Sequence, residues 1–181
     1  MNEIVLIALQ EEAPALAGAA NVFFTGVGKV NAALAASRLI ERHHPRRVWN
    51  FGTAGGVTVG GGIHRCTRFL QRDMRVGALG FAPGQTPFEE HVVLDLGGVG
   101  LLCSSGDSFV TDPTLDLHAD LVDMEAYAIA KACVLSRVEF ICHKFISDRA
   151  NAESTGDWRM NISAGQPHYL RLLEESSALN L

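Results

Sequence analysis

The sequence predicts one α/β domain over residues 1–181, with a central mixed, mostly parallel sheet flanked by helices. Short apolar runs of strand length alternate along the chain with stretches of helical periodicity. This order builds sheets that are covered by helices on both faces. Glycine-rich turns follow several of the apolar runs, where the backbone must bend sharply. The chain length suits one hydrophobic core, and no repeat, low-complexity segment or linker divides it.

The strands are expected where short apolar runs lie between turn signals. The first run, IVLIAL, lacks the preceding basic residues and the cleavage site of a signal peptide, so we interpret it as a strand. A later run, ICHKFI, has the apolar character of a buried strand. The expected strands are Ile4–Leu9, Asn21–Thr25, Arg47–Phe51, Arg65–Leu70, His91–Leu94, Gly100–Ser104 and Phe140–Ile146.

Helices are expected between these strands and at the end of the chain. Lys29–His43 is rich in alanine and stops before a proline. In Met124–Leu135, apolar residues recur on one helical face. A short helix is expected at Glu11–Leu16, and the tail from about Trp158 to Leu179 is predicted to form one C-terminal helix. Segment Gly80–Glu90 is irregular and is a candidate active-site or interface loop.

The composition argues against several classes of protein. A net charge of -5 disfavours a nucleic-acid partner, which requires a basic face, and we interpret the basic run Arg65–Arg75 as a solvated strand or loop. No stretch reaches the ~18 apolar residues of a membrane span. The histidines show no paired ligand spacing, so neither a metal nor a cofactor is expected. The cysteines lack CxxC spacing and indicate reduced, buried thiols of a cytoplasmic protein: Cys66, Cys103, Cys133 and Cys142.

Three acidic residues stand at the junctions of predicted strands and helices. Glu12 follows the first strand, Glu125 opens a helix, and Asp148 falls just past the last strand. Ligands of open α/β sheets bind at the carboxyl ends of strands, so these acids are candidates for one site. Acids are also favoured in turns and first helical turns for structural reasons, and that interpretation of each acid alone remains open.

Two glycine-rich turns were compared with known phosphate-binding motifs. The turn at Gly26–Gly28 has Asn31 where a dinucleotide fingerprint needs glycine. It also lacks the first glycine and the final hydroxyl residue of a Walker-type loop. The turn at Gly52–Gly56 matches neither motif. The glycines therefore indicate either close approach of the backbone to a ligand or tight packing of a strand against a helix.

Six strings in consistent order resemble one family. They are QEE at residues 10–12, TGVGKVNAA at 25–33, GTAGG at 52–56, SGDSF at 105–109, VDMEA at 122–126 and ISD at 146–148. Together they resemble the purine nucleoside phosphorylase/nucleosidase superfamily, and within it most closely the methylthioadenosine/S-adenosylhomocysteine nucleosidases. The resemblance runs from Ile4 to about Trp158 and implies a mixed sheet flanked by helices. It also implies cleavage of the N-glycosidic bond of a 5′-substituted adenosine.

The resemblance also implies roles for individual residues. Asp148 would donate a proton to N7 of the adenine, and Glu12 would bind and activate the attacking water. Thr53 stands where the family has a small hydroxyl residue near that water. Glu125, together with Met124, would hold the ribose hydroxyls.

The remaining residues carried over from the family would line the nucleoside pocket. Phe109 would pack on the purine, with backbone groups of Phe109 and Val110 reading its edge. Ser147 is counted among the substrate-binding residues. The pocket for the 5′ group would be lined by Leu9, Val27 and Trp158.

This chemistry is coherent without the family. Breaking a C–N glycosidic bond develops positive charge on the sugar and negative charge on the base. An acid at the leaving group and a base at the water form the arrangement that inverting glycosidases use on C–O bonds. An anionic Glu125 near the ribose would also favour a cationic sugar.

The chain departs from the family pattern in two respects, and alternatives remain. It is shorter than usual, and Lys144 stands where nucleosidases of the family often carry arginine. The alternatives are a phosphate-dependent phosphorylase, disfavoured by the acidic stretch around Glu12, a futalosine-type hydrolase, and a non-catalytic nucleoside-binding protein. A homodimer is expected because the apolar loop Phe81–Phe88 would be exposed on a small monomer.

Overall fold

The computed structural model describes residues 1–112, 114–115 and 117–176. Its strands are β1 Glu3–Ile7, β2 Val22–Phe24, β3 Arg47–Gly56, β4 Gly62–Gln71, β5 Leu94–Asp95, β6 Leu101–Ser105, β7 Leu121–Asp123 and β8 Glu139–Asp148. Its α-helices are α1 Lys29–His43, α2 Ala126–Ser136, α3 Ser154–Asn161 and α4 Gln166–Ser176. Short 3-10 turns lie at Gln10–Glu12, Pro14–Leu16 and Gly77–Leu79.

The strands form one eight-stranded mixed sheet in the order β2-β1-β3-β7-β6-β4-β5, with β8 pairing both β3 and β4. The pairs β1–β2, β1–β3, β3–β8, β4–β6 and β6–β7 are parallel. The pairs β3–β7, β4–β5 and β4–β8 are antiparallel. Strands β3, β8, β4, β6 and β7 therefore pair in a closed circuit, with β1 and β2 continuing from one side. The sheet is mixed and mostly parallel, as predicted.

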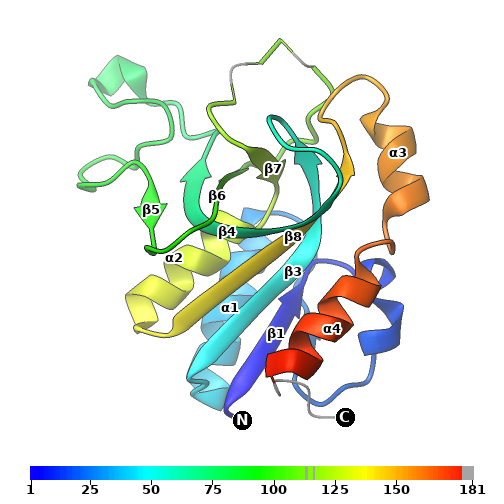
Figure 1. Ribbon diagram of the computed structural model, residues 1–181. Helices are drawn as coiled ribbons and strands as arrows, with labels where there is room; N and C mark the ends of the chain where they lie inside the picture. Colours follow the sequence, from blue (N-terminus) through cyan, green and yellow to red (C-terminus); the bar gives the residue numbers. More distant parts are fainter. Residues whose placement is uncertain (113, 116, 177–181) are drawn as a thin grey trace.

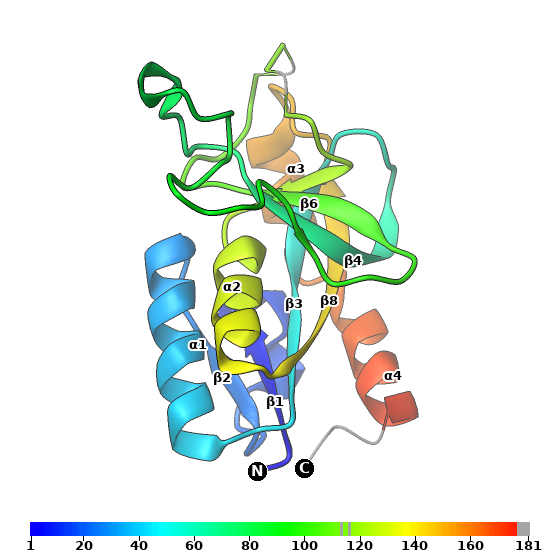
Figure 2. The same ribbon diagram turned by 90° about the vertical axis from the view of Figure 1, so that its left-hand side faces the viewer.

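Helices cover the two faces of the β1–β3–β8 part of the sheet (Figures 1 and 2). Helices α1 and α2 pack together on one face, where Ile4 and Leu6 of β1 join their apolar side chains. Helix α4 covers the opposite face, where Tyr169 and Leu173 pack with Val5 and its neighbours. Side chains alternate across a strand, so a strand buried on both faces must be apolar throughout. The IVLI sequence of β1 satisfies this requirement, and these four residues are fully buried.

Most predicted elements are present, with changed bounds. Helix α1 has the predicted limits, whereas α2 begins at Ala126 with Glu125 as its N-cap residue. Strands β3, β4 and β8 are longer than predicted. Asp148 is consequently the last residue of β8 and does not lie beyond the strand. The segment expected as a short helix at Glu11–Leu16 forms two 3-10 turns, because Pro14 starts a new turn.

One prediction about an element was wrong, and one strand was missed. The tail does not form one helix from Trp158 to Leu179, because α3 ends at Asn161 and a separate helix, α4, begins at Gln166. Gly165 lies between the two helices, and a Cβ atom there would lie 2.3 Å from the Tyr169 hydroxyl. Glycine at this position therefore allows the buried tyrosine to pack. Residues 177–181 of the predicted helix lie outside the described residues. Strand β7 was not predicted, because three residues give too short a pattern to recognise.

Several sequence-based expectations concern features outside the sheet. All four cysteines are free and buried, in agreement with the expectation of reduced thiols. Within the described residues, no helix combines the length and apolar character needed to cross a membrane. Nor do the described histidine, cysteine and acidic side chains form a group of three or more suited to a metal ion.

Candidate active site

A cavity of about 410 Å³ lies at the carboxyl ends of β1, β3 and β8 and beside β7. Every site residue proposed from the sequence lines it: Leu9, Glu12, Val27, Thr53, Phe109, Val110, Met124, Glu125, Ser147, Asp148 and Trp158. The other lining residues are Ala8, Ala54, Gly55, Arg72, Ser108, Thr111, Val122, Asp123, Thr155 and Arg159. Its volume falls in the range of small-molecule sites, which combine apolar walls with a few placed polar groups.

Glu12 is held at the cavity by donors from β3 and from the segment that follows β1. One carboxylate oxygen accepts hydrogen bonds from the Thr53 backbone N–H at 2.7 Å and its hydroxyl at 2.8 Å. The other oxygen accepts from the Leu9 N–H at 3.1 Å. The Trp158 indole N–H donates to the Thr53 hydroxyl at 3.1 Å, which orients the hydroxyl proton toward Glu12. A Cβ atom at Gly52 would lie 3.3 Å from both Glu12 Oε1 and Lys144 Nζ, so glycine leaves room for these side chains.

Asp148 is turned into the cavity by an irregularity at the end of β8. The β3–β8 register shifts between Ala54 and Gly55, which brings Gly55 opposite Asp148. A Cβ atom at Gly55 would lie 2.9 Å from Asp148 Oδ1. Any larger residue at position 55 would therefore displace the Asp148 carboxyl group. The Ser147 hydroxyl donates to Asp148 Oδ2 and the Ala150 N–H donates to Oδ1, both at 2.9 Å. The carboxyl group is thus buried and oriented by neighbours on its own segment.

Glu125 joins the N-terminal ends of two helices. It is the N-cap residue of α2, and its Oε1 accepts a 2.9 Å hydrogen bond from the N–H of Gly28, the N-cap residue of α1. Burial and, to a smaller extent, the nearby Asp123 carboxylate raise the pKa of Glu125 to about 7. The Lys144 ammonium and the Gly28 N–H act in the opposite direction. Glu125 therefore changes charge close to neutral pH.

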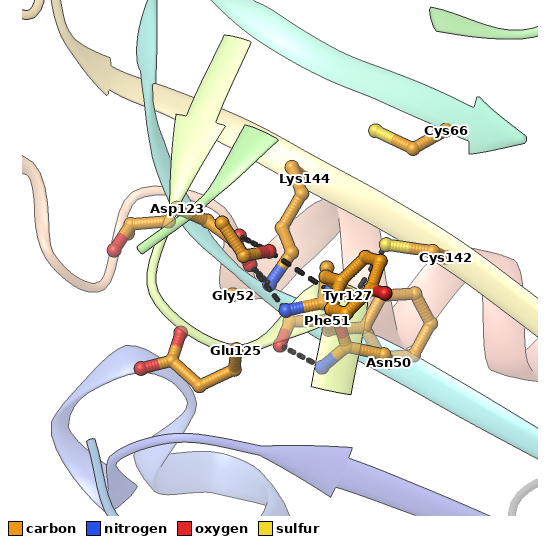
Figure 3. A network of polar contacts seen from close by, with 12 residues as sticks. Asn50, Phe51, Gly52, Cys66, Asp123, Glu125, Tyr127, Cys142 and Lys144 are labelled. Atoms are coloured by element: carbon orange, nitrogen blue, oxygen red, sulfur yellow. Dashed lines mark hydrogen bonds and ion pairs between the residues drawn. The ribbon is translucent and has the colours of Figure 1, made fainter. Parts of the chain in front are cut away.

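Lys144 and Asp123 form a buried ion pair beside Glu125 (Figure 3). Lys144 Nζ lies 2.9 Å from Asp123 Oδ2, and both side chains are almost inaccessible. The Ser105 hydroxyl and the Ala126 N–H also donate to Asp123. Burial alone would raise the pKa of Asp123, but Lys144 and these hydrogen bonds hold it below its usual range. Burial likewise opposes the charge of Lys144, but Asp123 raises the pKa of the ammonium well above its usual value.

Aromatic side chains form the outer wall of the cavity. The rings of Phe109 and Trp158 meet edge to face, with their centroids 6.2 Å apart. Phe109 is 44% exposed and Val27 is 40% exposed, so both stand at the mouth of the cavity. Trp158 belongs to α3, a helix that was predicted as the start of one longer C-terminal helix. Trp158 lines the cavity.

Arg72 is a cavity residue that sequence reasoning missed. The basic run Arg65–Arg75 was interpreted as solvated, which holds for the exposed Arg65, Arg68 and Arg75 but is wrong for Arg72. Its guanidinium is largely buried and donates to four backbone carbonyls at the ends of β6 and β7 and in the loop after β6. The available signal was its place directly after β4, but the strand was predicted to end one residue too early, at Leu70.

The first donors of α1 are occupied by carboxylates. The Gly28 N–H donates to Glu125, and the Lys29 N–H donates to Asp107 Oδ1 at 2.7 Å. The Lys29 ammonium pairs with Asp73, whose other oxygen accepts from the Asp107 N–H at 2.8 Å. A helix N-terminus attracts anions, and here protein side chains supply them.

Comparison with known proteins decides the family. The family model of the Phosphorylase superfamily matches residues 15–96. The 5′-methylthioadenosine/S-adenosylhomocysteine nucleosidase of Anoxybacillus flavithermus is 32% identical over 179 residues, covering 83% of this chain and 76% of the relative. The chain belongs to the methylthioadenosine/S-adenosylhomocysteine nucleosidase family. The resemblance inferred from the six sequence strings is thereby confirmed.

Solved structures share the fold of this nucleosidase family. A mutant Helicobacter pylori nucleosidase with 5′-methylthioadenosine in its active site has a TM-score of 0.85 at 18% identity, over 97% of this chain and 98% of that one. A Helicobacter pylori futalosine hydrolase mutant has a TM-score of 0.81 at 18% identity, over 92% and 94%. The fold is therefore common to solved structures of both kinds of protein.

Proposed function

We propose that this protein is a hydrolase that cleaves the N-glycosidic bond of a 5′-substituted adenosine and releases adenine. The observation that carries the proposal is the meeting of Glu12, Glu125 and Asp148 in one cavity, each with a different set of partners. Family membership agrees with this reaction, and the curated relative is named for methylthioadenosine and S-adenosylhomocysteine.

Asp148 is the proposed general acid. A purine leaves as an anion unless it is protonated, so a proton delivered to N7 lowers the barrier to bond cleavage. The Ser147 hydroxyl and the Ala150 N–H hold the two carboxyl oxygens in fixed directions, which favours one geometry of transfer. A positioned acid contributes about 10²–10⁴-fold to the rate of such steps.

Glu12 is the proposed base for the attacking water. Its carboxylate is anchored by Thr53 and Leu9, and the Lys144 ammonium lies close to it across Gly52. The anchored carboxylate can bind a water molecule and accept its proton as the new C–O bond forms. Thr53 belongs to the same unit, because its hydroxyl links Glu12 to Trp158.

Glu125 and Met124 are proposed to bind the ribose. One Glu125 oxygen is held by Gly28, which leaves the other available for the hydroxyl groups of the sugar. When Glu125 is ionised, its charge also stabilises the oxocarbenium-like sugar of the transition state. Since its pKa is about 7, this stabilisation develops as the pH rises through neutrality.

Water is favoured over phosphate as the nucleophile. The N-terminus of α1, where a phosphate would find backbone donors, is occupied by Glu125 and Asp107. The Arg72 guanidinium is engaged by four carbonyls, and Glu12 would repel an incoming dianion. These contacts argue against the phosphorylase alternative.

The remaining residues proposed from the sequence line the cavity and are proposed to bind the base and the 5′ group. Phe109 packs on the purine and the backbone of Val110 reads its edge, with Ser147 next to the base. Leu9, Val27 and Trp158 give the 5′ group an apolar surface, which suits a thioether substituent. The role of each of these side chains is part of the proposal.

The test compares substrates and two neighbouring glutamates. Wild-type protein is incubated with methylthioadenosine, S-adenosylhomocysteine and futalosine, and base release is measured. We expect release of adenine from the first two, and base release from futalosine alone would refute the proposed substrate class. Glu12→Gln should lose at least about 10²-fold in rate while still binding nucleoside. The matched control is Glu11→Gln, whose side chain is exposed and should leave the rate unchanged.

The proposal extends to assembly and location. The loop Phe81–Phe88 remains apolar and open, with Phe88 94% exposed and Leu79 just before the loop 69% exposed, which supports a homodimer. Light scattering should give twice the chain mass, whereas the mass of one chain would contradict the dimer. We also propose that residues 1–181 act as one domain and that the protein is cytoplasmic, since all four cysteines are reduced and buried.

A further inference from the structure

The Arg72 side chain joins three segments that border the cavity. Nη1 donates to the Ser104 carbonyl at 2.7 Å and to the Asp123 carbonyl at 2.8 Å. Nη2 donates to the Gly106 carbonyl at 3.0 Å and also to the Ser108 carbonyl. All four acceptors are backbone groups, so the guanidinium fixes the course of the main chain and neutralises no acidic side chain directly.

Two of these carbonyls belong to the peptide units of Phe109 and Met124, which line the cavity. The Ser108 carbonyl shares its peptide unit with the Phe109 N–H, in the loop proposed to read the purine. The Asp123 carbonyl shares its unit with the Met124 N–H, beside the proposed ribose site. A cationic donor on a carbonyl polarises the peptide and makes its N–H a stronger donor. The Asp123 carbonyl also accepts from the Gly106 N–H, so this peptide unit keeps a donor without Arg72. Arg72 therefore acts chiefly on the position and polarity of the Phe109 peptide unit.

The fit around Arg72 is specific to arginine. A Cβ atom at Gly106 would lie 2.9 Å from both Cγ and Cζ of Arg72, so the side chain passes directly against this glycine. A planar guanidinium can direct donors to four carbonyls at once, whereas a lysine ammonium is a point charge with three donors. Lysine would keep the charge but not the full set of bonds.

A second set of contacts anchors the same loop from outside. Asp107 accepts from the Lys29 N–H, and its own N–H donates to Asp73. These bonds do not involve the Arg72 side chain, so they remain when it is changed. The Gly106 N–H also donates to the Asp123 carbonyl at 3.2 Å, so the start of the loop stays attached to β7 without Arg72. The Ser108 carbonyl would lose its bond to the guanidinium, so the part of the loop from Ser108 onward would lose its fixed position.

We propose that Arg72 is a positioning residue that holds residues 108–110 of the purine-reading loop in place relative to the ribose-binding segment, residues 123–125, and so determines affinity for the base. The inference rests on the proposed function for the identity of the ligand. It assigns Arg72 no contact with the reacting atoms. Its effect reaches the substrate through the Phe109 peptide unit.

The experiment measures binding of the two halves of the substrate separately. Adenine and 5-methylthioribose are titrated by calorimetry into wild-type protein, Arg72→Met, Arg72→Lys and the control Arg75→Met. Arg75 is an exposed neighbour outside the cavity. Loss of hydrogen bonds from a charged group should weaken adenine binding by about 10-fold or more in Arg72→Met. Binding of methylthioribose should change by less than about 2-fold, and Arg72→Lys should fall between wild type and Arg72→Met.

The outcomes separate positioning from a general structural role. Unchanged adenine binding in Arg72→Met overturns the inference, and so does an equal loss of affinity for both ligands. If Arg72→Met does not fold, the same two titrations are made with Arg72→Lys. This variant should lose affinity for adenine but not for methylthioribose. Failure of the wild-type protein to cleave any nucleoside would refute the proposed function. Selective loss of adenine binding would still support the positioning role in that case.

Discussion

Replacing Glu125 with glutamine should stabilise the protein and inactivate it. Glutamine preserves the size of the side chain and the acceptor for the Gly28 N–H, but it cannot ionise. Glu125 has a pKa of about 7 in the folded protein, against 4.5 for an ordinary glutamate, chiefly because the side chain is buried. The wild-type protein must therefore keep a costly buried charge at its active site above neutral pH.

The two pKa values determine how much more stable Glu125→Gln should be than wild type, and over which pH range the difference develops. Between pH 4.5 and about 7 the unfolded chain has released the Glu125 proton and the folded protein has retained it. The stability contributed by the protonated group is complete below pH 4.5 and is lost as the pH rises through about 7. Above this range, the free energy of unfolding of the variant should exceed that of wild type by on the order of 3 kcal/mol. In a protein of this size that corresponds to a shift in Tm of roughly 6–12 °C.

The assay is thermal unfolding of wild type and Glu125→Gln from pH 4 to pH 9, with nucleoside cleavage measured in parallel. The variant should match wild type at the lowest pH and exceed its Tm increasingly up to about pH 8. Its kcat/KM should fall by about 10²-fold or more, since the anion that faces the sugar is gone. Glu41→Gln, an exposed change on α1, should give no such pH dependence. A variant less stable than wild type at pH 8 would refute the reasoning.

Three further changes test other parts of the site. Asp148→Asn should lower kcat by at least about 10²-fold with adenine binding retained, and near wild-type kcat would exclude it as the acid. Lys144→Met should destabilise the protein by about 3–5 kcal/mol in denaturant unfolding, because it leaves Asp123 buried without a counter-ion. Adding Asp123→Asn to Lys144→Met should recover part of this loss, and no recovery would contradict the pairing. Gly55→Ala should lower kcat by displacing Asp148, whereas Gly60→Ala, which has open space at Cβ, should not.

The convergence of the three acids was predictable because it depends on local signals. Glu12, Glu125 and Asp148 each lie next to an apolar run of recognisable length, and parallel strands bring such positions to one edge of the sheet. The helix Lys29–His43 was also predictable, since a glycine precedes it and a proline follows soon after it. These features need no knowledge of distant contacts.

Features that depend on distant contacts were not predictable. The partner of Lys144 is Asp123, and this pairing depends on the register of β7 against β3 and β6, which the sequence does not reveal. Arg72 looked like its exposed neighbours because its four acceptors are backbone carbonyls, which have no sequence signature. The break between α3 and α4 follows from the packing of Tyr169 against Gly165 and Phe145.

The identity of the sugar product tests the central claim most directly. Methylthioadenosine is incubated with the wild-type protein with and without added phosphate, and the products are separated and identified by mass and by phosphorus NMR. Water activated at Glu12 should give adenine and free methylthioribose in equal amounts, at a rate that does not depend on phosphate. Formation of methylthioribose 1-phosphate, or a rate that rises with phosphate, would contradict the account.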